Sequence, residues 1–268
     1  MNLYNHVLTK DKTSTFYSPK YEENYHSTGG ALREAFTKFI APCNIENLAS
    51  EGSLSVLDVG FGLGYNAMAA LYTARNINKE CLVEIVSLEE EVLGQECFKM
   101  IEVPLKYRDS FEIISQVSER KIYEKEGVKI EILSGDARQE IKKISRTFGA
   151  VFLDPFSPRK NPELWTVEFF RELYKRMDEF AILATYSSAT PVRSGLVEAG
   201  FTIGPGPGDH MKRGGTLATR GGKIPPLTAK EIARLSTSPE KIPYYDTNLH
   251  WTYREIMRHR DELKKSSC

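Results

Sequence analysis

The chain has 268 residues, of which 41% are hydrophobic, and its formal net charge is zero. This composition excludes a disordered chain and fits one α/β domain with appendages. No stretch approaches the roughly 20 apolar residues of a membrane helix, and the polar N-terminus lacks the apolar middle of a signal peptide, so we expect a cytoplasmic protein with no membrane partner.

Residues 1–53 are expected to form an N-terminal extension and a helix that cover the cleft of the domain. Residues 1–30 are rich in Tyr, Ser, Thr and Lys and predict loops or short strands. Residues 31–43 carry apolar side chains at helical spacing, and Pro42 ends this helix.

Residues 54–220 alternate between strand and helix patterns. The predicted strands are 54–59, 81–88, 128–133, 148–154, 179–186, 201–206 and 214–220, and the last two form a closing hairpin. The predicted helices are 64–75, 90–101, 107–127, 137–145, 163–177 and 190–200. This order predicts a Rossmann-like α/β fold with a mostly parallel, seven-stranded sheet and an antiparallel closing hairpin.

Three glycines follow the first of these strands, where such sheets bind their ligands. Glycine lets the backbone approach a ligand closely, and the next helix presents free N–H groups to an anion. The GxGxG spacing differs from the GxGxxG of dinucleotide-binding dehydrogenases, which are the disfavoured alternative. It is common in methyltransferases that use S-adenosyl-L-methionine (SAM). We therefore predict SAM as cofactor, bound by Asp58, Gly60, Phe61, Gly62, Gly64, Asn66, Glu89, Asp136 and Ala137.

Two acids in this set have alternative roles. Glu89 follows a strand and can accept hydrogen bonds from both ribose hydroxyls, or it can favour a helix N-terminus. Asp136 can bind the adenine amino group, as acids at this place often do in SAM enzymes, or cap a helix. Cap and ligand roles are compatible.

The segment "AVFLDPF" places an acid, a proline and an aromatic ring after an apolar strand. An alkyl amine has a solution pKa of about 10, so it arrives protonated. Asp154 can orient such an amine and receive its proton, while Pro155 fixes the chain and Phe156 stacks on a base. Alternatively, Asp154 caps a helix or pairs with Arg159 or Lys160. Tyr186 ends the fifth strand and lies in the cleft or in the core.

No metal site is expected. The four cysteines, Cys43, Cys81, Cys97 and Cys268, lack CxxC spacing and are interpreted as reduced thiols.

Three segments resemble a known family. "VGFGLGYN", "VFLDPFSPRKNPELWTVEFF" and "LATYSSATPVRSGLVEAGF" are similar to the methyltransferase domain of the tRNA 5-methylaminomethyl-2-thiouridine biosynthesis protein, MnmC. The string D-x-F-x-P-x-x-N-P-x-x-W, from Asp154 to Trp165, is highly specific to it. The resemblance covers roughly residues 54–220 and "YHSTGGALREAF" near the start.

The resemblance implies SAM-dependent N-methylation of 5-aminomethyl-2-thiouridine at the wobble position of tRNA. It implies that Asp154 is catalytic, with Pro155, Phe156 and Tyr186 beside it, and that the glycine loop, Glu89 and Asp136 contact SAM. Family members usually have glycine where this chain has Pro155, which makes "DPF" similar to the motif of amino-group methyltransferases. The bifunctional members carry an FAD-dependent oxidase for which 268 residues leave no room, so a separate enzyme is expected to supply the aminomethyl group.

Residues 221–268 are expected to form a basic C-terminal extension. Residues 204–268 contain 12 Lys and Arg against 7 Asp and Glu, which suits a polyanion such as tRNA. The predicted tRNA-binding residues are Arg159, Lys160, Arg193, Lys212, Arg213, Arg254, Arg258 and Arg260. The alternative is a solvated amphipathic helix that packs on the domain.

Two other functions share these features. An aminopropyltransferase of the spermidine synthase type would use decarboxylated SAM and a small polyamine. A SAM-binding, RNA-associated module would bind both ligands without turnover.

Overall fold

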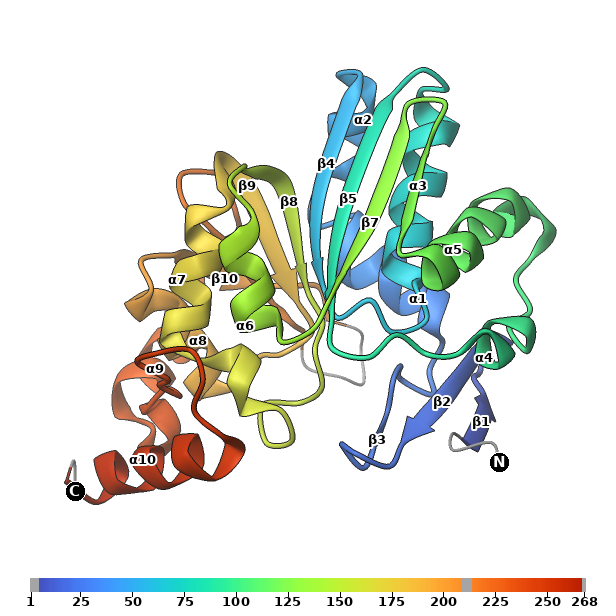
Figure 1. Cartoon of the computed structure of the whole chain (residues 1–268). Coiled ribbons are helices and arrows are strands. Elements are labelled where there is room, and N and C mark those ends of the chain that lie inside the picture. Colours follow the sequence, from blue (N-terminus) through green and yellow to red (C-terminus); the bar gives the residue numbers. More distant parts are fainter. Residues whose placement is uncertain (1–4, 209–213, 267–268) are drawn as a thin grey trace.

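The computed structural model describes residues 5–208 and 214–266, and an eight-stranded sheet forms its centre (Figure 1). The strand order is β10-β11-β9-β8-β4-β5-β7-β6. The strands are β4 (Ser53–Val59), β5 (Leu82–Glu89), β6 (Ile122–Lys125), β7 (Val128–Ser134), β8 (Phe148–Leu153), β9 (Met177–Thr185), β10 (Thr202–Pro205) and β11 (Thr216–Thr219). All neighbours from β9 to β7 are parallel, while β6, β11 and β10 pair antiparallel. The predicted Rossmann-like fold with its closing hairpin is confirmed.

The eighth strand lies in a stretch that was expected to be helical. Helix α5 (Arg108–Arg120) ends at Lys121, which has a φ of 66°. Strand β6 then pairs with β7 through a tight turn in which Glu126 and Gly127 both have positive φ, as hairpin turns that match the strand twist require. The helix prediction for residues 107–127 was therefore too long. Strand β6 is short and mostly exposed, so it lacks the alternation that marks a strand.

Helices cover both faces of the sheet. They are α1 (Ala31–Ala35), continued by a π-helical turn (Phe36–Ile40), α2 (Ile45–Ser50), α3 (Tyr65–Ile77), α4 (Gln95–Lys99), α5, α6 (Ala137–Glu140), α7 (Val167–Lys175), α8 (Thr190–Glu198), α9 (Ala229–Thr237) and α10 (Tyr253–Ser266). Helix α4 is shorter than the predicted 90–101, and the predicted helix 163–177 is divided by Thr166, whose hydroxyl caps α7.

The core has two layers, and both terminal extensions belong to them. Phe16 and Phe39 from the N-terminal extension pack with α3 and α5 on one face of the sheet. Tyr244 and Ile256 from the C-terminal extension pack with α7 and α8 on the other face. The extensions therefore share the core of the central domain, because each contributes side chains that are at most 2% exposed.

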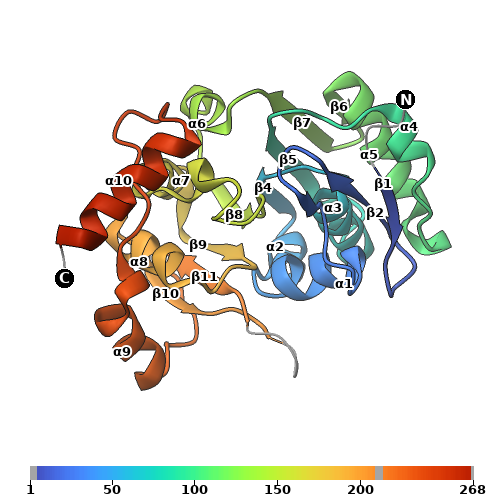
Figure 2. The same ribbon diagram turned by 90° about the horizontal axis from the view of Figure 1, so that it is seen from below.

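A small antiparallel sheet lies near the carboxyl ends of the central strands. It contains β1 (Asn5–Leu8), β2 (Ser14–Ser18) and β3 (Glu23–Asn24). Figure 1 shows this sheet and α10 on opposite sides below those strand ends, and Figure 2 looks onto the same edge. The two extensions thus flank the edge at which parallel sheets bind ligands.

Metal sites and membrane spans each need a recognisable arrangement of residues. Residues 5–208 and 214–266 contain no group of His, Cys, Asp and Glu side chains arranged to hold a metal ion. None of the helices in the same ranges combines the length and the apolar character of a membrane span. Cys43, Cys81 and Cys97 are free and buried, and Cys268 lies outside the described residues.

Candidate active site

A cavity of ≈ 980 Å³ lies at the carboxyl ends of β4, β5, β7, β8 and β9. Most of the residues predicted for cofactor binding and catalysis line it, although they come from five different strand ends. These are Gly60, Gly62, Glu89, Asp136, Ala137, Asp154, Pro155, Phe156 and Tyr186. The cavity is large enough for a small nucleotide ligand with room for a second group.

The glycine turn brings the ends of β4 and β8 into backbone contact. Gly60 has a φ of +95°, and a Cβ atom there would lie 2.7 Å from the carbonyl oxygen of Asp154. Gly64 has a φ of +75° and precedes α3, where a Cβ atom would lie 2.4 Å from Ile114. A side chain at Gly60 would force the ends of β4 and β8 apart, and one at Gly64 would clash with α5, so the turn keeps a narrow, backbone-lined path between them.

Glu89 ends β5 and holds the glycine turn. Its Oε2 accepts a hydrogen bond from the backbone N–H of Gly62 at 2.9 Å, and its Oε1 accepts from Glu91 N at 3.3 Å. Burial raises the pKa of Glu89, while these N–H groups oppose the shift. The carboxylate therefore sits in the cavity wall next to the turn, where it can also accept from a ligand hydroxyl.

Three residues predicted as cofactor contacts lie behind the cavity wall. Asp58 is fully buried and accepts a hydrogen bond from Ser87 Oγ at 2.9 Å, and burial raises its pKa to about 7. Phe61 is 2% exposed and belongs to the core. Asn66, in the first turn of α3, donates from Nδ2 to Asp154 Oδ2 at 2.8 Å. Asn66 thus contacts the Asp154 carboxyl group and does not line the cavity.

Asp154 follows β8 with its carboxyl group in the cavity. Burial raises its pKa well above the usual aspartate range, and the negative charge of Glu34 adds to the shift, which the Asn66 amide opposes. The alternative ion pair with Lys160 is not formed, because the Lys160 ammonium group pairs with Glu22. A half-buried carboxyl with a raised pKa is suited to receive a proton at neutral pH.

An aromatic wall stands beside Asp154. The Phe156 ring stacks on Tyr21, with centroids 4.2 Å apart, and meets Tyr25 edge-on at 5.0 Å. Tyr186 donates from its hydroxyl to Pro155 O at 2.9 Å, and Trp165 Nε1 donates to Phe156 O at 2.8 Å. These two bonds fix the loop that carries the Asp154–Phe156 segment.

The N-terminal extension supplies cavity residues that were not predicted individually. Four of them are Tyr21, Glu23, Tyr25 and Glu34. Glu23 accepts from the backbone N–H and the hydroxyl of Ser157, at 2.9 and 2.5 Å, which ties the extension to the loop after β8. Of these four, Tyr25 and Glu34 lie in a segment that the family resemblance included, and the irregular sequence around Tyr21 and Glu23 has no periodicity to indicate them.

The predicted tRNA-binding residues divide into three groups. Arg159, Lys160, Arg254 and Arg258 are exposed. Arg193 and Arg260 are 7% and 4% exposed, and they form ion pairs with Glu231 and Glu240, so they offer no charge to a phosphate. Lys212 and Arg213, like His210, lie outside the described residues.

Comparisons with known proteins agree with this arrangement. Residues 103–221 match the model of a family of S-adenosyl-L-methionine-dependent methyltransferases. The uncharacterized protein MJ0670 of Methanocaldococcus jannaschii is 36% identical over 97% of this chain and 73% of its own length. The bifunctional MnmC protein of Ralstonia nicotianae is 29% identical over 76% of this chain, which spans 33% of that relative.

One solved structure matches almost the whole chain. The crystal structure of MnmC2 from Aquifex aeolicus superposes with a TM-score of 0.91 and is 36% identical, covering 99% of this chain and 86% of the other. Sequence and fold therefore agree, and SAM is the cofactor. The chain belongs to the MnmC2-type family of S-adenosyl-L-methionine-dependent methyltransferases.

Proposed function

We propose that this methyltransferase N-methylates the 5-aminomethyl group of (2-thio)uridine at the wobble position of tRNA, giving 5-methylaminomethyl-(2-thio)uridine. One observation supports this most: a half-buried carboxyl, Asp154, lines one cavity together with the glycine turn and an aromatic wall. The printed name of the MnmC relatives refers to this same tRNA modification.

The cavity residues fit SAM without any metal. The turn from Gly60 to Gly64 offers a backbone cradle for the methionine end of the donor. Glu89 offers acceptors for the ribose hydroxyls, and Asp136 one for the adenine amino group. SAM supplies an activated methyl group, so the chain's own residues need only place the amine in line and take its proton.

Asp154 would act as the proton acceptor of the reaction. The incoming amine is protonated in water, and its nitrogen needs a free lone pair to attack the methyl carbon. The ammonium group first gives one proton to the Asp154 carboxylate, which frees the lone pair of its nitrogen. The neutral amine then forms the N–C bond while the C–S bond of the donor breaks, which gives a secondary ammonium group and S-adenosylhomocysteine. The raised pKa of Asp154 favours this transfer, because a more basic carboxylate is the better acceptor.

The surroundings of Asp154 suit an aminomethylated base. Phe156 and Tyr21 present aromatic faces on which a flipped-out base can stack, as single-stranded RNA bases commonly do. Glu23 and Glu34 add negative charge near the attacking amine. A cationic aminomethyl group is thereby favoured over a neutral hydroxyl or methyl group.

Replacing Glu34 with Gln is expected to move the acid limb of the kcat profile to lower pH. The Glu34 charge helps to raise the pKa of Asp154, so its removal lowers that pKa. The active form is the carboxylate, hence the variant stays active at lower pH than the wild type. Gln retains an oxygen that can accept from Ser27 N, as Glu34 does. An unchanged or upward-shifted limb, measured at saturating tRNA and SAM, would contradict the role of this charge.

The exposed cations beside the cavity are the proposed tRNA contacts. Arg159 and Lys160 follow the catalytic loop, and Arg254 and Arg258 lie on α10, whose first residue, Tyr253, lines the cavity. Changing both arginines of α10 to Gln is expected to weaken tRNA binding and to reduce the slope of log Kd against log salt by roughly 1–2. The matched control is Arg120→Gln, an exposed arginine at the end of α5. A slope equal to that of the wild type would remove α10 from the interface.

The direct test uses purified protein, SAM and tRNA that carries the unmethylated aminomethyl group. Mass analysis of the nucleosides is expected to show 5-aminomethyl-(2-thio)uridine gaining one methyl group. A parallel reaction with decarboxylated SAM and a polyamine tests aminopropyl transfer. Product in that reaction alone, or SAM binding without product in either, would contradict the proposal.

A further inference from the structure

Part of the C-terminal extension is fixed next to the cavity. The N–H of Val167 donates to Tyr244 O at 3.0 Å, and Asp246 N donates to Glu168 Oε2 at 2.7 Å. Gln139, in α6, donates to Leu249 O at 2.6 Å. The segment 244–253 is therefore anchored on α6 and α7, and it ends at Tyr253 in the cavity wall.

Asp246 is the buried centre of this segment. Its side chain is fully buried, and its Oδ1 accepts from the backbone N–H groups of His250 and Trp251 at 3.0 and 3.1 Å. Its Oδ2 accepts from Arg138 Nη1 at 2.7 Å. One oxygen thus orders the turn, while the other receives a charge-assisted bond from a helix on the central domain.

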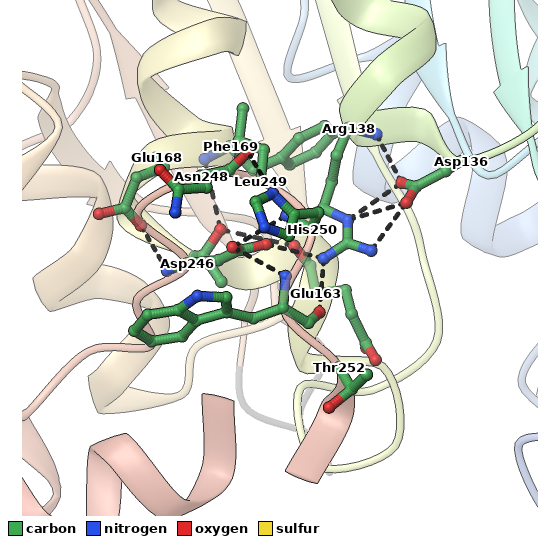
Figure 3. Close-up of polar contacts among 12 residues, drawn as sticks. Asp136, Arg138, Glu163, Glu168, Phe169, Asp246, Asn248, Leu249, His250 and Thr252 are labelled. Carbon is green, nitrogen blue, oxygen red and sulfur yellow. Dashed lines mark hydrogen bonds and ion pairs between the residues drawn. The ribbon is translucent and has the colours of Figure 1, made fainter. Parts of the chain in front are cut away.

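Arg138 transmits this contact to the cavity. It is 8% exposed, and its Nε and Nη2 donate to the two carboxylate oxygens of Asp136 at 3.0 and 2.7 Å, as Figure 3 shows. Its Nη1 also donates to Trp251 O at 2.7 Å. Because the guanidinium group is planar and bound on two sides, it cannot turn without breaking bonds at both ends.

Asp136 is left with room for one more donor. Its carboxylate offers about four acceptor positions. The backbone N–H and the Nε–H of Arg138 occupy two on Oδ1 and the Nη2–H occupies one on Oδ2, while Nε also lies 3.2 Å from Oδ2 as the longer arm of a bifurcated bond. The side chain is 40% exposed and lines the cavity. The remaining position is therefore available to a hydrogen-bond donor on a bound ligand.

We propose that Asp246 is a positioning residue for the methyl donor: through Arg138 it fixes the Asp136 carboxylate as the acceptor of the adenine amino group. The inference rests on the placement of SAM in the proposed function. It gives the segment after residue 221, where the family match ends, a part in the donor site. It also predicts that the site prefers adenine to hypoxanthine. Hypoxanthine has a carbonyl oxygen in place of the amino group, which would place a second acceptor against the carboxylate.

Asp246→Asn tests the proposal with little change in shape. The amide oxygen can still accept either from the backbone N–H groups of the turn or from Arg138. The NH₂ group then faces the donors on the remaining side, where no hydrogen bond can form. Binding of S-adenosylhomocysteine and S-inosylhomocysteine is measured by calorimetry. In the wild type the adenine compound is expected to bind about tenfold or more tightly, as a site built for a donor group rejects analogues that lack it. In Asp246→Asn this ratio is expected to fall towards one.

The ratio separates positioning from general support, because a looser fold weakens both compounds alike. The proposal would be overturned if Asp246→Asn left the ratio unchanged, whether both ligands bound as before or both lost the same factor in affinity. The control Glu240→Gln removes a charge that holds Arg260 and Lys264 of α10 and should leave the ratio unchanged. Arg138→Lys, which cannot bridge both carboxylates, is the second variant and should lower the ratio in the same way.

Asp136→Ala separates the placement of the adenine at Asp136 from the role of Asp246. If it leaves the ratio unchanged, the donor does not lie as the proposed function places it, and both proposals fail. If it removes the discrimination while Asp246→Asn keeps it, only the role of Asp246 is wrong.

Discussion

Replacing Asp154 with Asn is expected to lower turnover by about 10²-fold or more, the range typical of acid–base groups. The amide has the shape of the carboxyl, and its oxygen can still accept from Asn66 Nδ2. It cannot, however, take a proton from the amine. The Kd for SAM should change little, because Asp154 faces the amine and not the ribose or the base. Single-turnover rates and donor binding, measured on the same preparation, check both parts.

The matched control is Asp261→Asn, which removes an exposed carboxylate on α10. It should retain wild-type turnover. If Asp154→Asn turned over normally, Asp154 would have no part in the chemistry. If the variant lost SAM binding instead, the residue would support the donor pocket rather than act on the amine.

Replacing Glu89 with Ala is expected to raise the Kd for SAM by roughly 10-fold to 100-fold. Hydrogen bonds to a charged group contribute about 1.5–3 kcal/mol, and about 1.4 kcal/mol corresponds to a factor of ten. The variant also loses the bond from Gly62 N, which holds the glycine turn. Turnover at saturating SAM should fall much less, since Asp154 is unchanged.

Calorimetry with SAM measures this effect. Glu91→Ala serves as the control, because this neighbouring acid is exposed and should leave the Kd unchanged. A wild-type Kd for Glu89→Ala would mean that the residue only stabilises the helix or turn and does not contact the ribose.

The main features of the fold could be predicted because they depend on local patterns. Apolar runs ended by Gly60, Glu89 and Asp154 give parallel strands whose carboxyl ends meet at one edge. Strand β6 was missed because its four mostly exposed residues have no apolar face. Its identity depends on pairing with β7, which composition does not reveal.

The site was predicted less completely, because several of its contacts join distant parts of the chain. The sequence marks Asn66 as part of the glycine loop, yet its amide reaches Asp154, 88 residues away. The contact between Arg138 and Asp246 spans 108 residues and has no motif. Sequence spacing indicates which residues follow a strand, but not which side chains meet.

Net charge was a weak guide to the tRNA-binding surface. The excess of cations in residues 204–268 counts Arg260, whose guanidinium lies over the Tyr244 ring and donates to Ile242 O at 2.7 Å. Such an arginine stabilises the fold and offers no charge to a phosphate. Burial separates it from Arg258, whose side chain is 74% exposed on the same helix.

The most direct test of the central claim is a crystal structure with bound SAM or S-adenosylhomocysteine. The account predicts the methionine end of the donor in the Gly60–Gly64 turn, its ribose at Glu89 and its adenine at Asp136. The Asp154 carboxylate should face the sulfur or methyl group across a space that holds one amine. A donor bound elsewhere, with the turn empty, or an Asp154 side chain directed away from the methyl group, would contradict the account.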